Sequence, residues 1–345
     1  MFKIKQAVRA VLYASGAFGA YHRWRNRRTL TTLMFHRVLP VDSPEFAGAE
    51  REFTFTVEGF RRCLDFVQKH YQVVDLKALE AARAGQRALP PNAALITFDD
   101  GWLDTLQFAL PELQRRGLPA VVFVATEVLV SDSPRWWQAG LVTVLEAPER
   151  ARALASALGV DWPASGRRDG AFDRRMAAEL ANRPEAERVA LLKSVGLVAD
   201  AEAPRQMMRR GDLPKPGVSP LQVGAHGHTH APLTEAADPP GELGRSHAAM
   251  REVAGDVPAS MSFPHGAYDL SLLDAAQRAG FDLLFTSDPV LTDCSRDARL
   301  PAVHGRLHVP ENQWTCDAGV ISFPMLSTFL FFRPKRFLAS AGQIS

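Results

Sequence analysis

Short, continuous apolar runs alternate with amphipathic stretches along most of the chain. Residues 57–70 repeat apolar side chains at helical spacing, whereas residues 93–98 (AALITF) form an unbroken apolar run typical of a buried strand. By the same criteria we expect strands at residues 29–39, 71–76, 120–125, 221–225, 259–263, 283–286 and 306–309, and helices at 103–116, 241–252 and 270–279. Apolar strands that alternate with helices favour parallel strands covered on their outer side.

The alternation is interrupted once, over residues 138–215. This stretch is rich in Ala, Arg and Glu at helical spacing and contains little that resembles a strand. We interpret it as a helical insertion. The remaining pattern predicts the α/β class, as a distorted (β/α) barrel of about seven strands that carries this insertion.

These patterns divide the chain into four parts. The barrel is expected to comprise two stretches of chain that flank the insertion. The expected parts are a basic amphipathic N-terminal helix at 1–28, the barrel at 29–137 and 216–312, the insertion at 138–215, and an apolar and basic C-terminal tail at 313–345.

Composition is typical of a globular protein, but the charge is unevenly distributed. Hydrophobic residues make up 46% of the 345 residues and charged residues 23%, which excludes wholesale disorder. The net charge of +2 gives no indication of nucleic-acid binding. However, residues 1–40 hold eight basic side chains and no acidic one, so the rest of the chain has an acidic excess. A basic head on an acidic body favours an anionic partner, and we expect a membrane surface.

The N-terminal region has the pattern of a helix that lies on a membrane. No uncharged run reaches the ~20 apolar residues that a spanning helix needs. One helical face carries Ile4, Val8, Val11 and Leu12. Such a face either contacts a bilayer surface or packs on the body of the protein. We expect a cytoplasmic protein that contacts the inner membrane through this helix, helped by residues 323–332. Secretion is the alternative, although Arg9 interrupts the apolar run of a signal peptide.

Two adjacent carboxylates follow the apolar strand at 93–98. Buried carboxylates are costly unless they are paired or bound to a cation, so Asp99 and Asp100 suggest a site. Neighbouring side chains of a strand point to opposite sides, and a turn at Gly101 is needed to bring both to one place. The alternative is an Asp-Asp-Gly turn that only caps the next helix.

Three histidines follow the expected strand at 221–225. His226 and His230 are four residues apart and share one face if the chain turns helical there, whereas His228 then points elsewhere. Two imidazoles and one carboxylate are a common ligand set for a divalent transition metal with open positions. We expect Zn²⁺, with Co²⁺ or Ni²⁺ able to replace it. The alternative is that each histidine only packs in the core or on the surface.

A third polar cluster, Ser-Phe-Pro-His-Gly at residues 262–266, also lies at the end of an expected strand. Alone it is a turn sequence. The order of the three clusters, however, resembles the polysaccharide deacetylase family, also known as carbohydrate esterase family 4 or the NodB-homology domain. The likeness covers about residues 29–309 without the insertion, and Met34–Val38 is similar to the opening strand of bacterial members that act on exopolysaccharides.

This resemblance implies a distorted (β/α) barrel and metal-dependent removal of acetyl groups from N-acetylated sugars. It implies that Asp99 is the general base, and that the metal ligands are Asp100, His226 and His230. Candidates for the catalytic acid are His308, the nearest match to a late family motif, and His36 at the end of the first strand. The expected substrate-binding residues are Pro264, His265, Gly266 and Arg306.

The sequence departs from the family pattern at two positions. Gly227 stands where members often have Ser or Thr, and Ser262 stands where an arginine is frequent. The second departure leaves the group that orients Asp99 unassigned, and Arg306 is a conceivable substitute.

We therefore expect a hydrolase that removes N-acetyl groups from an amino-sugar polysaccharide or a glycan precursor. Trp136 and Trp137 are candidates for a sugar-stacking surface, with a core role as the alternative. One rival is a deformylase or amidase acting on a lipid-linked sugar, which the basic head favours. The other is a catalytically silent glycan-binding barrel, and the four intact residues of the metal and base set count against it.

Overall fold

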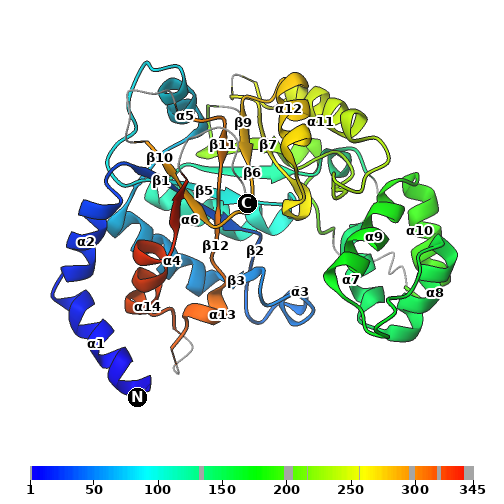
Figure 1. Ribbon diagram of the computed structural model, residues 1–345, viewed down its shortest axis with the longest axis horizontal. Coiled ribbons are helices and arrows are strands. Elements are labelled where there is room, and N and C mark those ends of the chain that lie inside the picture. The colour runs from blue at the N-terminus through cyan, green and yellow to red at the C-terminus, as the bar shows by residue number, and fades with distance from the viewer. Residues whose placement is uncertain are drawn as a thin grey trace.

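A mostly parallel sheet lies at the centre of the computed structural model, with helices packed around it (Figure 1). The structure describes residues 2–131, 136–197, 205–215, 217–255, 257–294, 300–316 and 320–337. The strands β5 (Ala93–Phe98) and β6 (Ala120–Val124) are buried along their whole length. Their apolar side chains fill both faces, as the continuous runs predict.

The parallel strands form a nearly closed barrel. They follow the order β1 (Thr29–Phe35), β5, β6, β7 (Leu221–Ala225), β8 (Ser260–Ser262) and β9 (Leu283–Phe285). A single segment then joins the two ends, because β11 (Val303–His304) pairs with β9 and β12 (Leu307–His308) pairs with β1. The predicted fold class is thereby confirmed.

Short strands extend the sheet at its edges. β4 (Gln72–Val73) pairs with β5, β10 (Val290–Asp293) runs antiparallel to β1, and β13 (Lys335–Phe337) pairs with β10. The further described elements are α1 (Phe2–Ala14), α2 (Ala17–Arg25), β2 (Arg37–Leu39), α3 (Pro44–Ala47), β3 (Thr54–Thr56), α4 (Val57–His70), α5 (Leu76–Arg83), η1 (Thr105–Ala109), α6 (Leu110–Arg116), η2 (Thr126–Leu129), α7 (Trp137–Leu145), α8 (Pro148–Leu158), α9 (Gly170–Ala181), α10 (Glu185–Ser194), η3 (Arg210–Asp212), α11 (Pro239–Val253), η4 (Pro264–Gly266), α12 (Leu270–Arg278), α13 (Glu311–Trp314), α14 (Phe323–Ser327) and η5 (Thr328–Phe332).

Several predicted elements differ in detail from the structure. The strand expected at 71–76 forms only over Gln72–Val73, because Asp75 caps the helix that begins at Leu76. The strand expected at 29–39 divides at His36, because Asp104 accepts hydrogen bonds from the Val38 amide at 3.1 Å and from the Arg37 side chain at 2.8 Å. The helix expected at 103–116 begins with the wide turn η1, in which the Leu110 amide donates to the carbonyl of Thr105. Pro111 follows and has no amide hydrogen to donate, which suits an irregular helix start.

Four helices, α7 to α10, form a lobe beside the barrel (Figure 1). These helices occupy most of the stretch at 138–215 that was expected to be a helical insertion. Residues 198–204 and 216 lie outside the described part of the chain. Arg188 of α10, 1% exposed, forms an ion pair with Glu127 of η2. This buried pair links the lobe to the loop after β6.

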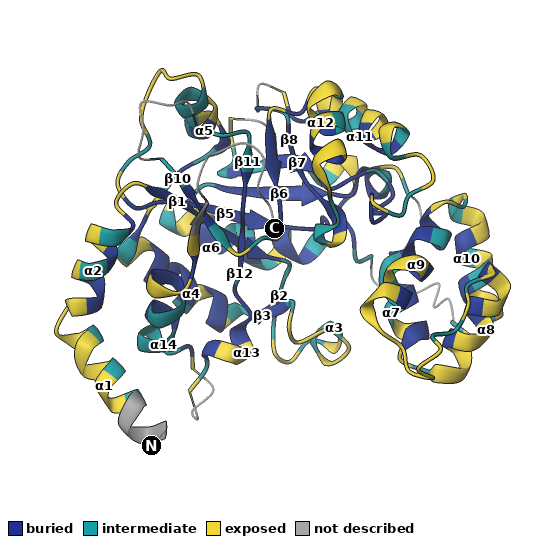
Figure 2. Ribbon diagram, viewed as in Figure 1, coloured by how far each residue is buried: buried dark blue, intermediate teal, exposed yellow. Residues whose placement is uncertain are grey.

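The N-terminal helices contact the C-terminal segment. The His22 ring stacks on Phe331 at 4.1 Å, and Arg25 donates to the carbonyls of Phe331 and Pro334. In contrast, Val8 and Val11 are 52% and 67% exposed, so the apolar residues of α1 predicted to share a face do not all pack on the body (Figure 2). The side chain of Ile4 lies outside the described part. Within the described ranges, no helix combines the length and apolar character needed to cross a bilayer.

Candidate active site

The predicted polar clusters meet at the carboxyl ends of the barrel strands. Phe35 of β1 pairs with Phe98 of β5, so His36 and Asp99 leave neighbouring strands at the same level. His226 follows β7, and its amide donates to the carbonyl of Val124 at the end of β6. Because parallel strands end at one edge, residues far apart in the sequence come together at the edge where α/β barrels carry their chemistry.

The chain turns sharply after Asp99. Asp100 has φ 76° and Gly101 has φ 90°, so the turn begins one residue earlier than the sequence suggested. A Cβ atom at Gly101 would lie 2.6 Å from a methyl carbon of Val124, which requires glycine there. Among the described residues, four non-glycine residues have positive φ, and three of them are Asp100, His230 and His265. Backbone strain gathers at functional sites in this way.

Asp100, His226 and His230 form a buried cluster whose ligand atoms lie within 4.8 Å of one another. The Asp100 Oδ1 atom is 3.6 Å from His226 Nε2 and 3.3 Å from His230 Nε2. The Nδ1 atom of His226 faces the carbonyl oxygen of Ser262 at 2.8 Å. A carbonyl only accepts, so this nitrogen donates and leaves the Nε2 lone pair directed at the cluster.

The charge state of the cluster suits a cation. Burial, with the nearby His230, lowers the pKa of His226 to about 4, although Asp99 opposes the shift. Burial alone would raise the pKa of Asp100, but the neighbouring histidines outweigh it and hold that pKa well below its usual range. At neutral pH, the cluster therefore presents an ionised carboxylate and the neutral His226 imidazole. This donor set fits a divalent transition metal.

Asp99 is held by a buried arginine from the other end of the chain. Arg306 donates to Asp99 Oδ1 at 2.6 Å and to Oδ2 at 2.7 Å, and it also donates to Thr286 and Ser262. Burial raises the pKa of Asp99, but Arg306 and His226 outweigh it, so the carboxyl stays ionised. Arg306 was expected among the substrate-binding residues. Its side chain is fully buried, however, and it binds Asp99 instead of lining a surface that is open to substrate.

Both candidate acids lie at the same edge of the barrel. The His36 and His308 rings are 5.8 Å apart, and Phe53 stacks on His308 at 5.2 Å. Burial and the nearby His36 lower the pKa of His308 to about 4. His36 Nδ1 is buried, with no hydrogen-bond partner among the described residues. The two imidazole rings therefore lie side by side. The His308 ring stacks on Phe53, whereas His36 Nδ1 has no hydrogen-bond partner among the described residues.

The third cluster packs directly against the histidine turn. The exposed His265 ring lies 4.6 Å from the His230 ring. Gly227 has φ 69°, and a Cβ atom there would lie 3.0 Å from Pro264 Cγ, which explains glycine where Ser or Thr is frequent. His228 points away from the cluster, with its Nδ1 atom 2.8 Å from Thr126 Oγ1.

Sequence reasoning missed a chain of contacts behind Asp100. The Trp102 indole donates to Asp100 Oδ2 at 2.7 Å, the Arg37 guanidinium lies 4.0 Å above the Trp102 ring, and Arg37 pairs with Asp104. The Trp136 ring, in turn, lies 4.8 Å from His230. The only hint of these contacts in the sequence was a tryptophan directly after the Asp-Asp-Gly turn. Which group its indole N–H binds depends on how the turn folds.

Replacing Trp102 by Phe should weaken metal binding about 10- to 100-fold, because partners of a metal-ligating carboxylate usually contribute that much affinity. Competition with a chromophoric chelator measures the dissociation constant. Trp162→Phe, in the helical lobe, is the matched control and should leave it unchanged. Equal metal affinity in all three proteins would show that the indole does not orient Asp100.

Comparison with known proteins identifies the fold. No protein-family model matches the sequence, and no curated protein matches it. Among solved structures, the Streptococcus pyogenes deacetylase PplD in complex with acetate aligns with a TM-score of 0.53 and 15% identity, over 88% of this chain and 98% of that one. A putative polysaccharide deacetylase from Bacillus anthracis aligns with a TM-score of 0.50 and 11% identity, over 88% and 69%. The chain has the fold of these deacetylases.

Proposed function

We propose that the protein is a metal-dependent hydrolase that removes N-acetyl groups from an amino-sugar polysaccharide or a glycan precursor. The observation that carries this proposal is the buried cluster of Asp100, His226 and His230 beside the Arg306-bound Asp99. The cluster lies at the catalytic edge of a barrel shared with polysaccharide deacetylases. A candidate general base next to a candidate metal site supports this proposal.

In this proposal, Asp100, His226 and His230 hold the metal, and Zn²⁺ is the expected ion, with Co²⁺ or Ni²⁺ able to replace it. An ion held there would supply Lewis-acid chemistry, polarising the acetamide oxygen of the substrate and lowering the pKa of water. Asp99 then accepts the proton of the attacking water as general base. Its Oδ2 atom is 3.9 Å from His226 Nε2, so it adjoins the ligands. Arg306 is a positioning residue that keeps the Asp99 carboxylate ionised and oriented.

The departing amine needs a proton from a general acid. We assign the role of general acid to His36, with His308 as the alternative. A general acid must be protonated at working pH, and His308, with a pKa of about 4, is neutral there. In contrast, His36 Nδ1 is buried and has no hydrogen-bond partner in the described part of the chain, so it is available to a bound group.

His36→Asn should lower kcat by ~10²–10⁴-fold and remove the basic limb of the pH–rate profile, because that limb reports deprotonation of the acid. His308→Asn should keep the limb. The pH dependence of acetate release from both variants checks this. Loss of the limb only in His308→Asn would reverse the assignment.

A substrate comparison tests the proposed function against its rivals. The protein is incubated with Zn²⁺ and either N-acetylated or N-formylated chitooligosaccharides, and the released acid is identified. Acetate release supports the proposal, and formate release alone would indicate the deformylase. Metal binding with no released acid from either substrate, including lipid-linked forms, would indicate a silent glycan-binding barrel.

We further propose that the N-terminal helices contact a membrane, on the cytoplasmic side as the sequence analysis expects, and hence that a lipid-linked sugar is the second candidate substrate. Val8 and Val11 of α1 are largely exposed, and Trp24 of α2 is 77% exposed. Basic side chains accompany them, and each Lys or Arg near an anionic surface contributes ~1 kcal/mol. Apolar and basic groups together are what an interfacial helix presents to lipid.

Val11→Glu together with Trp24→Ser should abolish co-sedimentation of the full chain with anionic vesicles, and high salt should weaken binding of the parent. Val41→Glu, at a valine that is 66% exposed and lies outside the helices, is the control. A shorter chain that lacks residues 1–28 gives a second comparison. Equal sedimentation of all variants, or a processed N-terminus recovered from the periplasm, would contradict the membrane contact.

A further inference from the structure

Both ends of the helical lobe pack against the turn that carries Asp100. Trp136, at the N-terminal cap of α7, places its ring 5.3 Å from the ring of Trp102. On the other side of the lobe, the chain returns to the barrel after α10, and the Met208 amide donates to the carbonyl of Gly101 at 2.9 Å. The two connections of the lobe therefore contact the turn from which one proposed metal ligand projects.

The loop after β6 holds the turn that carries the two histidine ligands. At the start of η2, the Thr126 amide donates to the carbonyl of Gly227 at 3.1 Å. The next amide, that of Glu127, donates to the carbonyl of His228 at 2.9 Å. Both carbonyls belong to the short stretch of chain between the two proposed histidine ligands. The backbone between these ligands is therefore fixed by the position of η2.

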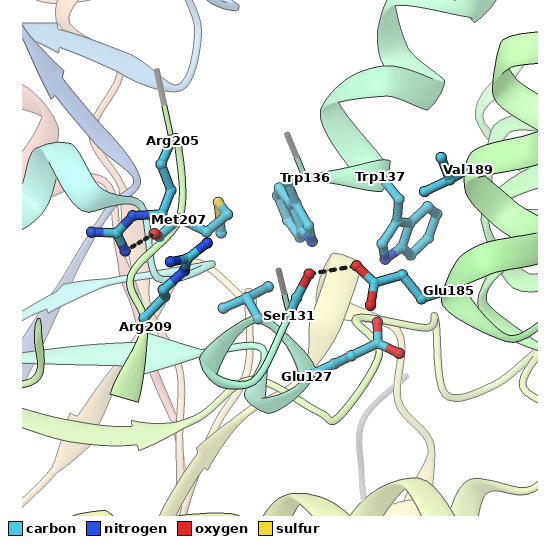
Figure 3. A pocket seen from close by; sticks show the side chains of 10 residues that line it. Glu127, Ser131, Trp136, Trp137, Glu185, Val189, Arg205, Met207 and Arg209 are labelled. Carbon is cyan, nitrogen blue, oxygen red and sulfur yellow. Dashed lines mark hydrogen bonds between the residues drawn. The ribbon is translucent and has the colours of Figure 1, made fainter. Parts of the chain in front are cut away.

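The lobe in turn holds η2 through a buried ion pair. Arg188 of α10 is 1% exposed and pairs with Glu127. The guanidinium also donates to the carbonyl of Arg183 at 2.8 Å, at the start of the same helical region. Close by, Ser131 donates a hydrogen bond to Glu185 of α10 (Figure 3). The loop that holds the histidine turn is therefore anchored to the lobe.

The interface around this ion pair is tightly packed. Trp136 and Trp137 are 5% and 7% exposed, so both rings pack inside the protein, which is the alternative to a sugar-stacking surface. The Arg188 guanidinium lies 5.4 Å from the centre of the Trp137 ring. In such an interior, an apolar pair of similar volume is usually as stable as a buried ion pair or more stable. Stability alone therefore does not account for Arg188, whereas a directional contact fixes how the lobe and η2 lie relative to each other.

We propose that the helical lobe positions the metal ligands, and that Arg188 is a positioning residue that acts on the histidine turn through Glu127. This inference rests on the proposed function, because the ligands are those of the proposed metal site. Contacts run from Arg188 to η2, and from η2 to the backbone between His226 and His230. Loss of the ion pair should displace the two imidazoles relative to Asp100 and weaken metal binding, although Arg188 itself lies outside the ligand cluster.

Substitutions of Arg188 in the full chain test this inference. Arg188→Met should weaken Co²⁺ binding about tenfold and change the visible absorption spectrum of the bound ion, because the ligands move. Arg188→Lys keeps the charge and should restore part of both properties. Arg183→Met is the matched control, since the Arg183 side chain pairs with Glu179 and Glu187 within the lobe, and both properties should stay unchanged. Competition with a chromophoric chelator gives the dissociation constant, and circular dichroism identifies the folded variants.

A doubly substituted protein separates positioning from a folding defect. Arg188→Met combined with Glu127→Gln leaves neither charge of the pair without its partner. It should lose no more metal affinity than Arg188→Met alone, because both changes break the same contact. Parental affinity and spectrum in either folded variant would overturn the inference, and so would additive losses in the double variant.

A measurement without metal distinguishes failure of this inference from failure of the proposed function. In metal-free protein with ¹⁵N-labelled histidines, the imidazole signals of His226 and His230 should shift in Arg188→Met and stay in place in Arg183→Met. His226→Ala identifies the signal of His226. Shifted signals, with no acetate released by the parent protein, would contradict the proposed function and support the positioning role. Unshifted signals would overturn the positioning role, while acetate release by the parent would still support the hydrolase.

Discussion

Replacing Asp99 by Asn is expected to lower turnover by ~10²–10⁴-fold while the metal stays bound with nearly the parental affinity. The amide of Asn cannot accept the proton of water as a base. Asp99 lies beside the ligand cluster, and its carboxylate is bound to Arg306 through both oxygens. Acetate release and a metal titration of the same preparation give the two quantities.

Arg306→Lys is the companion variant for this experiment. It keeps the positive charge but cannot donate to both oxygens of Asp99 in the same geometry. We expect a smaller loss of kcat and an acid limb of the pH–rate profile moved to higher pH, because the pKa of Asp99 rises as its support weakens. If Asp99→Asn lost the metal and Asp100→Asn retained it, the two carboxylates would have exchanged roles.

Removal of the metal is expected to abolish acetate release, and addition of Zn²⁺, Co²⁺ or Ni²⁺ should restore it. His226→Ala and Asp100→Asn should weaken metal binding itself, because each removes one of the ligand atoms that lie within 4.8 Å of one another. Chelation, elemental analysis and reconstitution measure this. His228→Asn is the matched control, since His228 belongs to the same turn but contacts Thr126. Full activity of metal-free protein would exclude the metal mechanism.

The sequence predicted the barrel and the cluster because both depend on local patterns. A short stretch of sequence is enough to recognise a continuous apolar strand, and parallel strands end at a common edge of the sheet. Local patterns alone therefore group Asp99, Asp100, His226 and His230. The resemblance to the deacetylase family supplied the roles expected of them.

The supporting contacts could not be predicted in the same way. Arg306 contacts Asp99 across 207 positions of sequence, from a strand pair too short to give a periodic signal. The sequence suggested it only as a conceivable partner. The Trp102–Asp100 hydrogen bond depends on the positive φ of Asp100, which nothing in the residue type requires. The break of the first strand at His36 likewise depends on Asp104, a side chain from another element.

The segment from β11 to β12 also sets an order of events during synthesis. A ribosome makes Asp99 and all the proposed metal ligands long before it reaches Arg306. Until then, a buried Asp99 carboxylate would have no guanidinium partner, which is costly in an apolar interior. The same residues complete the seam between β9 and β1. A nascent chain interrupted before residue 303 would therefore have neither the paired barrel seam nor the Arg306 partner of Asp99, so the proposed site cannot be complete until this segment has been translated.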